Sequence, residues 1–293
     1  MVDALKLMRI PFSVYLMPVY WFALSVLPEF CVYKAVYVFV IIHLLVYPAS
    51  NGYNSFYDKD EGSIGGLKHP PKVTRKLLWL VLLFDFLALV GSFVLVSLEF
   101  TSGIFIYLLV SKAYSYDKIR LKKYPLVSTL VVIIFQGAFT FIMVQVGART
   151  LPAHIMTATN LLFALVSTLF LCGSYPLTQV YQHQEDAQRG DQTLSLALGI
   201  TGTFIFSALS LLLGAGFLIW NYLVTGQAMN ILIFLVCTGP VVYIFGTWFW
   251  QVKKDPTMAN FENTMRMNKV SSLSMSAAFI LILLFTHYKL GSL

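Results

Sequence analysis

Charged residues are scarce in this sequence. Only 11% of its 293 residues are Asp, Glu, Lys or Arg, whereas soluble domains carry about 25%. None lies between Thr150 and Gln184, and none lies between Gln192 and Val252. Apolar stretches of about 20 residues are long enough to cross the hydrocarbon core of a bilayer as helices. The scarcity of charge therefore excludes an ordinary soluble domain and indicates an all-α polytopic membrane protein.

Cysteine is also scarce, and its placement excludes two further classes. Cys31, Cys172 and Cys237 lie far apart, so the sequence offers neither a disulfide framework nor the spacing of a cysteine metal site. We interpret all three as thiols inside the membrane.

Nine apolar segments are candidate transmembrane helices, so we predict a single helical bundle over residues 1–293. Two four-helix halves, roughly 10–123 and 124–251, are followed by one extra helix. The predicted spans are 11–30, 33–56, 76–98, 101–118, 126–147, 153–183, 193–220, 228–251 and 262–287.

The basic residues predict the orientation of these spans. With a cytoplasmic N-terminus, all but Lys34, Arg149 and Lys289 fall in cytoplasmic segments, a bias that sets membrane orientation strongly. This placement explains the net charge of +7, which would suggest nucleic acid in a soluble protein. We therefore expect the lipid bilayer and no nucleic acid as a partner, with the loops of the candidate site on the cytoplasmic side.

Two segments resemble each other. YPASNGYNSFYDKDEG (47–62) ends the second predicted span, and YPLTQVYQHQEDAQRG (175–190) ends the sixth. Because both fall at the same end of a span, they predict a duplicated four-helix unit. Five positions are identical and two pair an asparagine with a glutamine: Tyr47/Tyr175, Pro48/Pro176, Tyr53/Tyr181, Asp58/Asp186, Gly62/Gly190, Asn51/Gln179 and Asn54/Gln182.

The repeat predicts a two-part metal site. Each proline would kink or loosen its helix, and the two polar faces could point at each other across the bundle. Carboxylate and amide oxygens are ligands that Mg²⁺ accepts, usually together with substrate phosphates. In each copy two amides and one aspartate are spaced i, i+3 and i+7, which would place them on one helix face: Asn51, Asn54 and Asp58, and Gln179, Gln182 and Asp186.

Basic residues near these segments could bind a polyphosphate, because Lys and Arg neutralise the charge that develops on a leaving diphosphate. Lys122 and Lys123, by contrast, are interpreted as ordinary cytoplasmic charges that meet lipid headgroups. The aromatic and aliphatic interior nearby could hold a long isoprenoid tail. The candidate phosphate ligands lie in loops at the same end of the bundle: Lys68, Lys72, Lys118, Arg120 and Arg189.

Three short segments, NSFYD (54–58), YSYDKIR (114–120) and DAQRGDQTLSLALG (186–199), together with the nine-span layout, resemble the UbiA superfamily of intramembrane prenyltransferases. Members of that family hold Mg²⁺ and a prenyl diphosphate with two Asp-rich motifs, and a Tyr and Lys/Arg segment contacts the diphosphate. The matching positions are Asn54 and Asp58 in the first motif, Asp186, Gly190, Thr193 and Leu194 in the second, and Tyr114, Lys118 and Arg120 in the basic segment.

The sequence departs from the family pattern at three acidic positions. Ser55 and Gly62 stand where the first motif has its first and third aspartates, and Gln182 replaces the first aspartate of the second. The carboxylates that could compensate lie off the face of the repeat: Asp60, Glu61, Glu185 and Asp191. The resemblance thus implies a metal site with few acids, whose catalytic residues would be Asn54, Asp58, Gln182 and Asp186.

The implied reaction is Mg²⁺-dependent transfer of a prenyl group from a prenyl diphosphate to a lipophilic acceptor within the membrane. Family frequency favours an aromatic acceptor of the quinone-precursor type. Two other classes stay open: a transporter or channel, whose sites usually lie near the bilayer midplane, and a catalytically weakened relative that binds prenyl lipids.

Asp85 is the one acid expected deep inside a span, where a carboxyl is costly unless it is paired or protonated. His43, at a similar depth on the second span, is its predicted partner.

Overall fold

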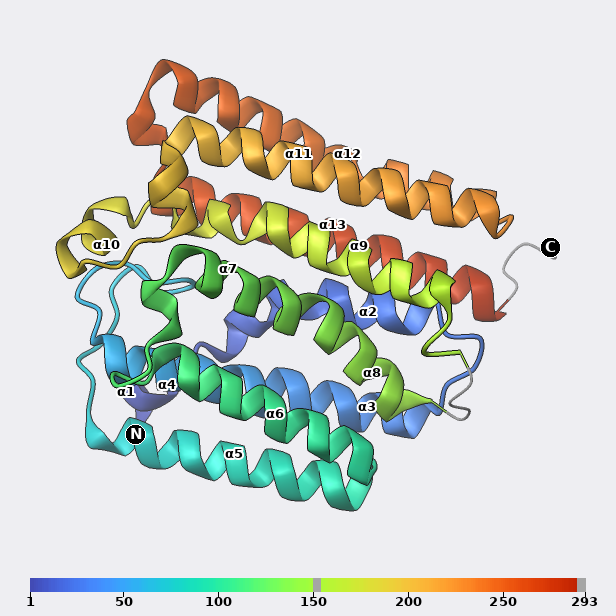
Figure 1. The fold of residues 1–293 in the computed structure, drawn as a ribbon, viewed down its shortest axis with the longest axis horizontal. Helices are drawn as coiled ribbons and strands as arrows, with labels where there is room; N and C mark the ends of the chain where they lie inside the picture. Colours follow the sequence, from blue (N-terminus) through green and yellow to red (C-terminus); the bar gives the residue numbers. More distant parts are fainter. Residues whose placement is uncertain (150–153, 289–293) are drawn as a thin grey trace.

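The chain folds into a bundle of helices (Figure 1). The structure, a computed structural model, describes residues 1–149 and 154–288, and within them it contains helices joined by loops. With η marking a 3₁₀ or π-helix, the elements are α1 (Val2–Leu7), η1 (Ile10–Leu16), α2 (Met17–Ser25), α3 (Val32–Val40), η2 (Ile41–Val46), α4 (Tyr47–Asp58), α5 (Arg75–Leu95), α6 (Leu98–Ser115), η3 (Leu121–Lys123), α7 (Pro125–Ile133), η4 (Ile134–Phe139), α8 (Thr140–Ala148), α9 (Ala158–Ser174), η5 (Pro176–Gln179), α10 (His183–Arg189), α11 (Leu194–Val224), α12 (Ala228–Lys254), η6 (Pro256–Met258) and α13 (Phe261–Tyr288).

The prediction of an all-α membrane protein is confirmed, with one difference in the count of spans. Eight stretches of the described residues are long and apolar enough to cross a membrane, against nine predicted. The difference is α6, which has 18 residues but carries Glu99 near its start and Lys112 near its end. Lys289, one of the basic residues used to predict orientation, lies outside the described residues.

The long helices lie side by side along the long axis of the molecule, with α5 at one edge and α11 and α12 at the other (Figure 1). Between these edges α13 packs on α2 and α12, and α2 packs on α8. Phe22 of α2 lies at the centre, with its ring 4.4 Å from that of Phe279, 5.1 Å from Phe141 and 5.6 Å from Phe163. Because truncating a buried Phe costs about 3–5 kcal/mol, these contacts fix the two halves against each other.

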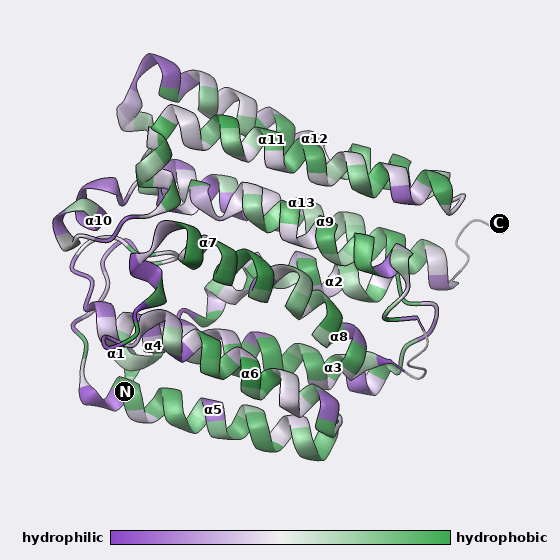
Figure 2. Ribbon diagram, viewed as in Figure 1, coloured by the Kyte–Doolittle hydropathy of each residue, from purple (hydrophilic) through white to green (hydrophobic). Residues whose placement is uncertain are grey.

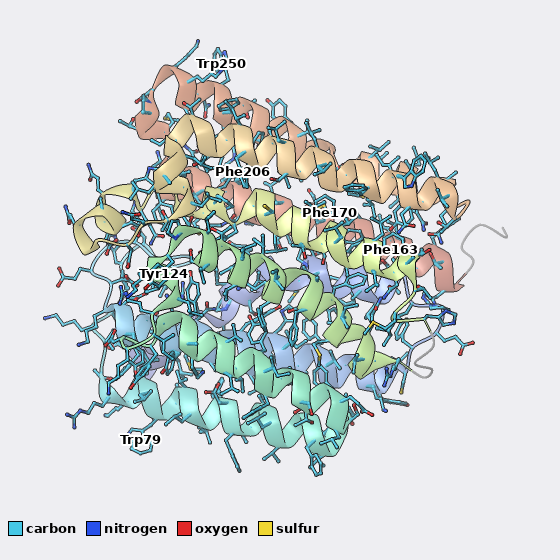
Figure 3. The ribbon with its side chains drawn as sticks, viewed as in Figure 1. Trp79, Tyr124, Phe163, Phe170, Phe206 and Trp250 are labelled. Atoms are coloured by element: carbon cyan, nitrogen blue, oxygen red, sulfur yellow. The ribbon has the colours of Figure 1, made fainter. Side chains whose placement is uncertain are left out.

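The outer surfaces of the edge helices are apolar, as lipid contact requires. Trp79 on α5 is 73% exposed, and Trp250 on α12 is 59% exposed. Both side chains point away from the bundle, whereas Phe163 and Phe170 lie in its middle (Figure 3). Trp commonly anchors helices at a membrane interface.

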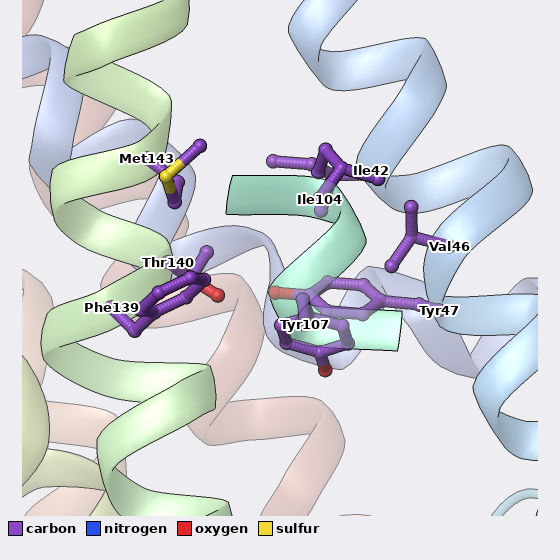
Figure 4. A pocket seen from close by; sticks show the side chains of 8 residues that line it. All are labelled: Ile42, Val46, Tyr47, Ile104, Tyr107, Phe139, Thr140 and Met143. Atoms are coloured by element: carbon purple, nitrogen blue, oxygen red, sulfur yellow. The ribbon is translucent and has the colours of Figure 1, made fainter. Parts of the chain in front are cut away.

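Two spans contain a π-helical turn, η2 and η4, where the regular hydrogen-bond ladder loosens. In η4, Gly137 lets the chain approach α9 closely, because a Cβ there would lie 2.7 Å from Thr168 Cα. A void of about 10 Å³ remains beside η2 and α8, lined by rings that include Tyr107 and Phe139 (Figure 4). It has room for about one water molecule, so it is a packing defect rather than a substrate site.

Hydrophilic residues gather at one end of the bundle, where α10 and the N-terminus lie (Figure 2). We call this the polar end; it comprises the loops 59–74, 116–124 and 180–193. It includes the segments that follow both copies of the repeat, and so it is the place to look for the predicted site.

Candidate functional site

The first copy of the repeat forms a continuous helix at its polar residues. α4 runs unbroken to Asp58, so Asn51, Asn54 and Asp58 share one face, as predicted. The loosening expected from Pro48 takes the form of the π-helical turn η2, directly before α4. Asn54 Oδ1 accepts a hydrogen bond from Ser115 Oγ at 2.8 Å, which ties α4 to the end of α6.

Two cations from the loop between α6 and α7 converge on Asp58. The Lys122 ammonium donates to Asp58 Oδ1, and Arg120 Nη2 lies 4.0 Å from the same oxygen. Arg120 has left-handed backbone angles (φ 43, ψ 60) and directly precedes η3, which carries Lys122. The interpretation of Lys122 as a headgroup-facing charge is wrong, since this residue is only 9% exposed and its ammonium is bound inside the site.

Arg120 joins the first copy of the repeat to the segment that follows the second. Its Nη2 and Nε lie 2.9 and 3.4 Å from the two carboxylate oxygens of Asp191, and its Nη1 lies 3.6 Å from Asp117. Asp191 is buried, whereas Asp117 is exposed. Hydrogen bonds to charged groups contribute about 1.5–3 kcal/mol, so this bridge helps to hold the two segments together.

The second copy of the repeat is not one helix. α9 ends before Pro176, the 3₁₀-helix η5 follows, and α10 begins only after Gln182, whose φ of −101° and ψ of 2° are not helical. The prediction that Gln179, Gln182 and Asp186 share a helical face is therefore wrong. The expected loosening at Pro176 occurs, but here it ends the helix, since proline provides no N–H for a helical hydrogen bond.

Side chains of the second copy bind neighbouring loops. Gln182 Nε2 donates to the Ser63 carbonyl oxygen at 3.1 Å, in the loop after α4. Asp186 Oδ2 accepts from Thr193 Oγ1 at 3.3 Å, and the same hydroxyl caps α11 by accepting from the Leu196 N–H at 3.2 Å. The position of Asp186 is thus coupled to the start of α11.

A chain of three polar side chains connects the two halves. Tyr114 and Tyr175 share a hydroxyl–hydroxyl hydrogen bond of 2.9 Å, and Gln179 Nε2 donates to the Tyr175 hydroxyl at 3.0 Å. Gln179 is only 8% exposed, and among the described residues its Oε1 has no hydrogen-bond partner. A buried carbonyl oxygen of this kind is available to accept from a ligand or to coordinate a cation.

Carboxylates from both copies surround Tyr181. Burial is the main reason why the pKa of Tyr181 is raised, and Asp60, Glu185 and Asp186 raise it further, whereas Arg9 opposes them. Glu185 reaches the first copy directly, since a Cβ built on Gly62 would lie 2.6 Å from its Oε2. Its carboxylate therefore lies at the place where the resembled family has an aspartate. The repeat aligns Gly62 with Gly190, so the sequence pattern could not predict that Glu185 of the second copy contacts Gly62 of the first.

The other predicted phosphate ligands lie farther from this centre or point elsewhere. Lys68 forms an ion pair with Glu262 at the start of α13, and both side chains are exposed. Lys72 and Lys118 are exposed in their loops. Arg189 ends α10, but its side chain lies outside what the structure describes.

A cavity of about 910 Å³ lies beside the polar centre. Part of its polar lining comes from Asn51 and Asn54 on α4, Tyr114 and Ser115 on α6, and Tyr175, and further polar side chains such as Gln136 and Asn268 line it elsewhere. Asp58 lies one turn beyond Asn54, so Asp58 and its cations stand next to this part of the cavity lining without forming part of it. Cavities of this size hold organic ligands. The aromatic walls include Phe22, Phe135, Phe170, Phe245 and Phe279.

Arg9 also lines this cavity and was not among the predicted site residues. Its Nη1 and Nη2 donate to the carbonyl oxygens of Gly65 and Asn51 at 3.3 and 3.4 Å. Among the described residues its buried Nε has no hydrogen-bond partner. In the sequence, Arg9 is one arginine before the first long span, so it could not be distinguished from the basic residues that set membrane orientation.

Asp85 is paired, but not with His43 as predicted. Its Oδ2 lies 2.8 Å from the Lys112 ammonium of α6, which also lies over the Tyr53 ring at 4.7 Å. His43 Nδ1 instead lies 3.2 Å from the Ser13 carbonyl oxygen. The ion pair fastens α5 to α6 and lies outside the set of cavity-lining residues.

The two halves differ in how well they fit a metal ion. Within residues 1–149 and 154–288, no group of three or more His, Cys, Asp or Glu residues could hold one. In the first half, Asp58 binds Lys122 and Asn54 accepts from Ser115, so the donor set does not fit Mg²⁺. The second half offers the carboxylate of Asp186 and the unpartnered Gln179 Oε1, hard oxygen ligands that suit Mg²⁺ when substrate phosphates complete the site.

Comparison with known proteins gives a family and several structures. The model of the UbiA prenyltransferase family matches residues 13–270. Among curated proteins, none matches the sequence.

Three solved structures illustrate the likeness in fold. A structure of digeranylgeranylglyceryl phosphate synthase has a TM-score of 0.60 at 17% identity, covering 97% of each chain. A UbiA homologue from Archaeoglobus fulgidus bound to GPP and Mg²⁺ has a TM-score of 0.65 at 15% identity, covering 96% of this chain and 99% of that one. The same homologue bound to DMAPP and Mg²⁺ has a TM-score of 0.64 at 14% identity and the same coverage. At these identities the likeness shows the fold.

Proposed function

The chain belongs to the UbiA prenyltransferase family, and from this premise we propose that it transfers a prenyl group from a prenyl diphosphate to a lipophilic acceptor within the membrane. The match confirms the resemblance to this family that the sequence analysis predicted. Homologous structures bound to GPP or DMAPP with Mg²⁺ support a prenyl diphosphate as donor and a divalent metal as cofactor.

The observation that carries the proposal is the junction of charge and cavity. Arg120 and Lys122 converge on Asp58 next to a cavity of about 910 Å³ whose walls are mainly aromatic and aliphatic. A prenyl diphosphate has the same two parts, an anionic head and an apolar tail. The charges would bind the head while the tail lies in the cavity.

In the proposed reaction the allylic C–O bond breaks and its electrons leave with the diphosphate. The acceptor attacks the prenyl carbon and loses the proton of its C–H or O–H bond, which passes to the diphosphate or to water. Arg120 and Lys122 would stabilise the charge on the leaving diphosphate without reorganising, because Asp58 and Asp191 already hold them. Mg²⁺ in the second half, bound by Asp186 and Gln179, would add further neutralisation of that charge. Aromatic faces, such as that of Tyr114, would favour positive charge on the prenyl carbon by about 2 kcal/mol when desolvated.

We propose an aromatic acceptor of the quinone-precursor type. The ring-rich cavity wall supports an aromatic body, and the Arg9 guanidinium on the lining supports an anionic substituent such as a carboxylate. A phosphorylated glyceryl lipid is the competing acceptor, because digeranylgeranylglyceryl phosphate synthase shares the fold.

The test uses purified protein in lipid nanodiscs with Mg²⁺, labelled geranylgeranyl or farnesyl diphosphate, and a panel of both acceptor types. We expect diphosphate release and a prenylated product. Asp58→Ala and Asp186→Ala should each lower turnover by about 100-fold or more, as loss of preorganised electrostatic stabilisation does. Asp3→Ala, an exposed acid at the same end, is the control.

Three results would count against the proposal. Full turnover in both aspartate variants would show that these residues have other roles. Binding of diphosphate without turnover on any acceptor would indicate a catalytically weakened relative. Substrate flux across liposomes without chemical conversion would indicate a transporter, although the pairing of Asp85 with Lys112 gives little support to a polar path.

A further inference from the structure

The contacts of Asp58 place two cations where a metal ion would bind in the first half of the site. Mg²⁺ requires several oxygen ligands in near-octahedral geometry. Here Lys122 donates to Asp58 Oδ1, Arg120 stands 4.0 Å from the same atom, and Asn54 Oδ1 accepts from Ser115. A divalent cation at Asp58 would also meet two positive charges at close range, where burial weakens solvent screening of their repulsion.

The same two cations are well placed to bind an anion. A lysine ammonium has three N–H donors and an arginine guanidinium has five, so the contacts with Asp58 and Asp191 leave donors over. Lys122 is only 9% exposed, and the left-handed backbone of Arg120 fixes the turn that carries both side chains. Their positions are set before any ligand arrives.

The position of this cation pair matches the head of the proposed donor. Asn54 and Ser115 line the cavity and are hydrogen-bonded to each other at 2.8 Å. Asp58 lies one helical turn beyond Asn54 on the same face of α4. Lys122 and Arg120 do not line the cavity, but through Asp58 they stand next to the part of its lining formed by Asn54 and Ser115, within reach of the diphosphate of a donor whose tail lies inside.

Resting on the proposed function, we infer that the first half of the site binds the diphosphate through the Lys122 ammonium and the Arg120 guanidinium, without a metal ion. Asp58 is then the anchor of these cations, and any Mg²⁺ is held by the second half alone. The Lys122 ammonium thus occupies the position at Asp58 where the repeat predicts a metal ion. Lys122, whose charge alone predicted only contact with lipid headgroups, is then a substrate-binding residue.

The first test counts metal ions on the full chain. Purified protein in nanodiscs is titrated with Mn²⁺ in the presence of inorganic diphosphate, and bound Mn²⁺ is counted by electron paramagnetic resonance. We expect no more than one ion per chain. Lys122→Met should add one ion, because it uncovers Asp58. Two ions bound with Lys122 in place would overturn the inference.

The second test removes metal. In EDTA the wild-type chain should still bind inorganic diphosphate in isothermal titration calorimetry. Lys122→Met should raise the Kd in EDTA by roughly 10- to 100-fold, the loss expected for a hydrogen bond to a charged group. Lys123→Met is the matched control, because Lys123 is adjacent in sequence but exposed, and its Kd should stay within about twofold of wild type.

The outcomes separate this inference from the proposed function. Diphosphate binding that EDTA abolishes in the wild type, or that Lys122→Met leaves unchanged in EDTA, overturns the inference and leaves prenyl transfer standing. Failure of the wild type to bind diphosphate either with Mn²⁺ or in EDTA removes both. If Lys122→Met does not fold, the ion count and the EDTA titration of the wild type decide the question by themselves.

Discussion

The segments 47–62 and 175–190 share a sequence pattern but differ in backbone and in what holds their aspartates. In the first, α4 is continuous to Asp58, whose carboxylate binds Lys122. In the second, the helix ends before Pro176 and restarts after Gln182, and Asp186 accepts from the Thr193 hydroxyl. The aspartate of the first copy is therefore held by an ion pair, whereas the aspartate of the second is hydrogen-bonded to the capping residue of α11.

The difference comes from the surroundings of each copy. α4 packs against α5 and α6, so its polar face has a neighbouring helix along its length. The second copy is packed too, since η5 contacts α11 and α13, but beyond η5 its side chains bind loops, such as Gln182 to the Ser63 carbonyl oxygen. Equivalent residues in a repeat can thus have unequal roles, and this can be tested one contact at a time.

The largest contrast is expected between Asp58→Ala and Asp186→Ala in stability. Asp58→Ala leaves two cations beside an empty carboxylate position and should lower the free energy of unfolding by about 3–5 kcal/mol. Asp186→Ala removes the hydrogen bond from Thr193 and should cost about 1 kcal/mol. Equilibrium unfolding in mixed micelles measures both, and equal losses would show that the two copies are braced alike.

Arg120→Ala should have the next largest effect, because it cuts the bridge from Asp58 to Asp191 while Asp58 keeps Lys122. We expect a loss of about 2–3 kcal/mol in the free energy of unfolding, measured in the same way. Arg75→Ala, which removes an exposed arginine at the start of α5, should be nearly neutral. A similar loss for both variants would contradict a bridging role.

Thr193→Val tests the coupling between Asp186 and α11. Loss of a helix cap should cost about 1 kcal/mol of stability. The control is Thr157→Val, which removes the cap of α9 at the opposite end of the bundle, where Thr157 Oγ1 accepts from the Asn160 N–H at 3.3 Å. Both variants should lose similar stability, but only Thr193→Val should lower diphosphate release. An equal fall in diphosphate release in both variants would mean that the role of Asp186 does not depend on its hydrogen bond with Thr193.

The smallest effect concerns His183, which has Ser55 at the matching place in the first copy. Burial lowers the pKa of His183 below its ordinary value of 6.5. As pH falls below 6.5, the unfolded chain binds a proton that the folded protein still excludes, so stability contributed by neutral His183 is lost. In thermal melts, the Tm of His183→Gln should therefore fall less between pH 7 and pH 5 than the Tm of the wild type. His69→Gln, at an exposed histidine, should keep the wild-type slope.

The sequence predicted the fold well where hydropathy decides it. Long apolar stretches located the spans to within a few residues, and the i, i+3, i+7 spacing located the polar face of α4. It failed at 175–190, because the effect of Pro176 depends on what packs around it and not on the repeat pattern. The helical face predicted for Gln179, Gln182 and Asp186 required one continuous helix, but the chain forms η5 after Tyr175 and becomes α-helical again only at His183.

The site was predicted only in part, because its key contacts join residues far apart in the chain. Lys122 was indistinguishable from Lys123 by composition, and only the folded chain shows that Lys122 is buried against Asp58 whereas Lys123 is exposed. Glu185 lies off the face of the repeat, yet it reaches Gly62 from the other copy. Sequence spacing describes neighbours within one element, whereas these contacts depend on how elements pack.

The Asp85–Lys112 pair has a consequence for how the chain enters the membrane. α5 and α6 are separated only by Val96 and Ser97, and α6 is the helix that is too polar to qualify as a span by hydropathy. Alone, each helix would carry an uncompensated charge into hydrocarbon, which is costly. Folded back on each other, they bring the two charges to 2.8 Å. We expect this hairpin to leave the translocation machinery as a unit, with α5 retained until α6 is synthesised.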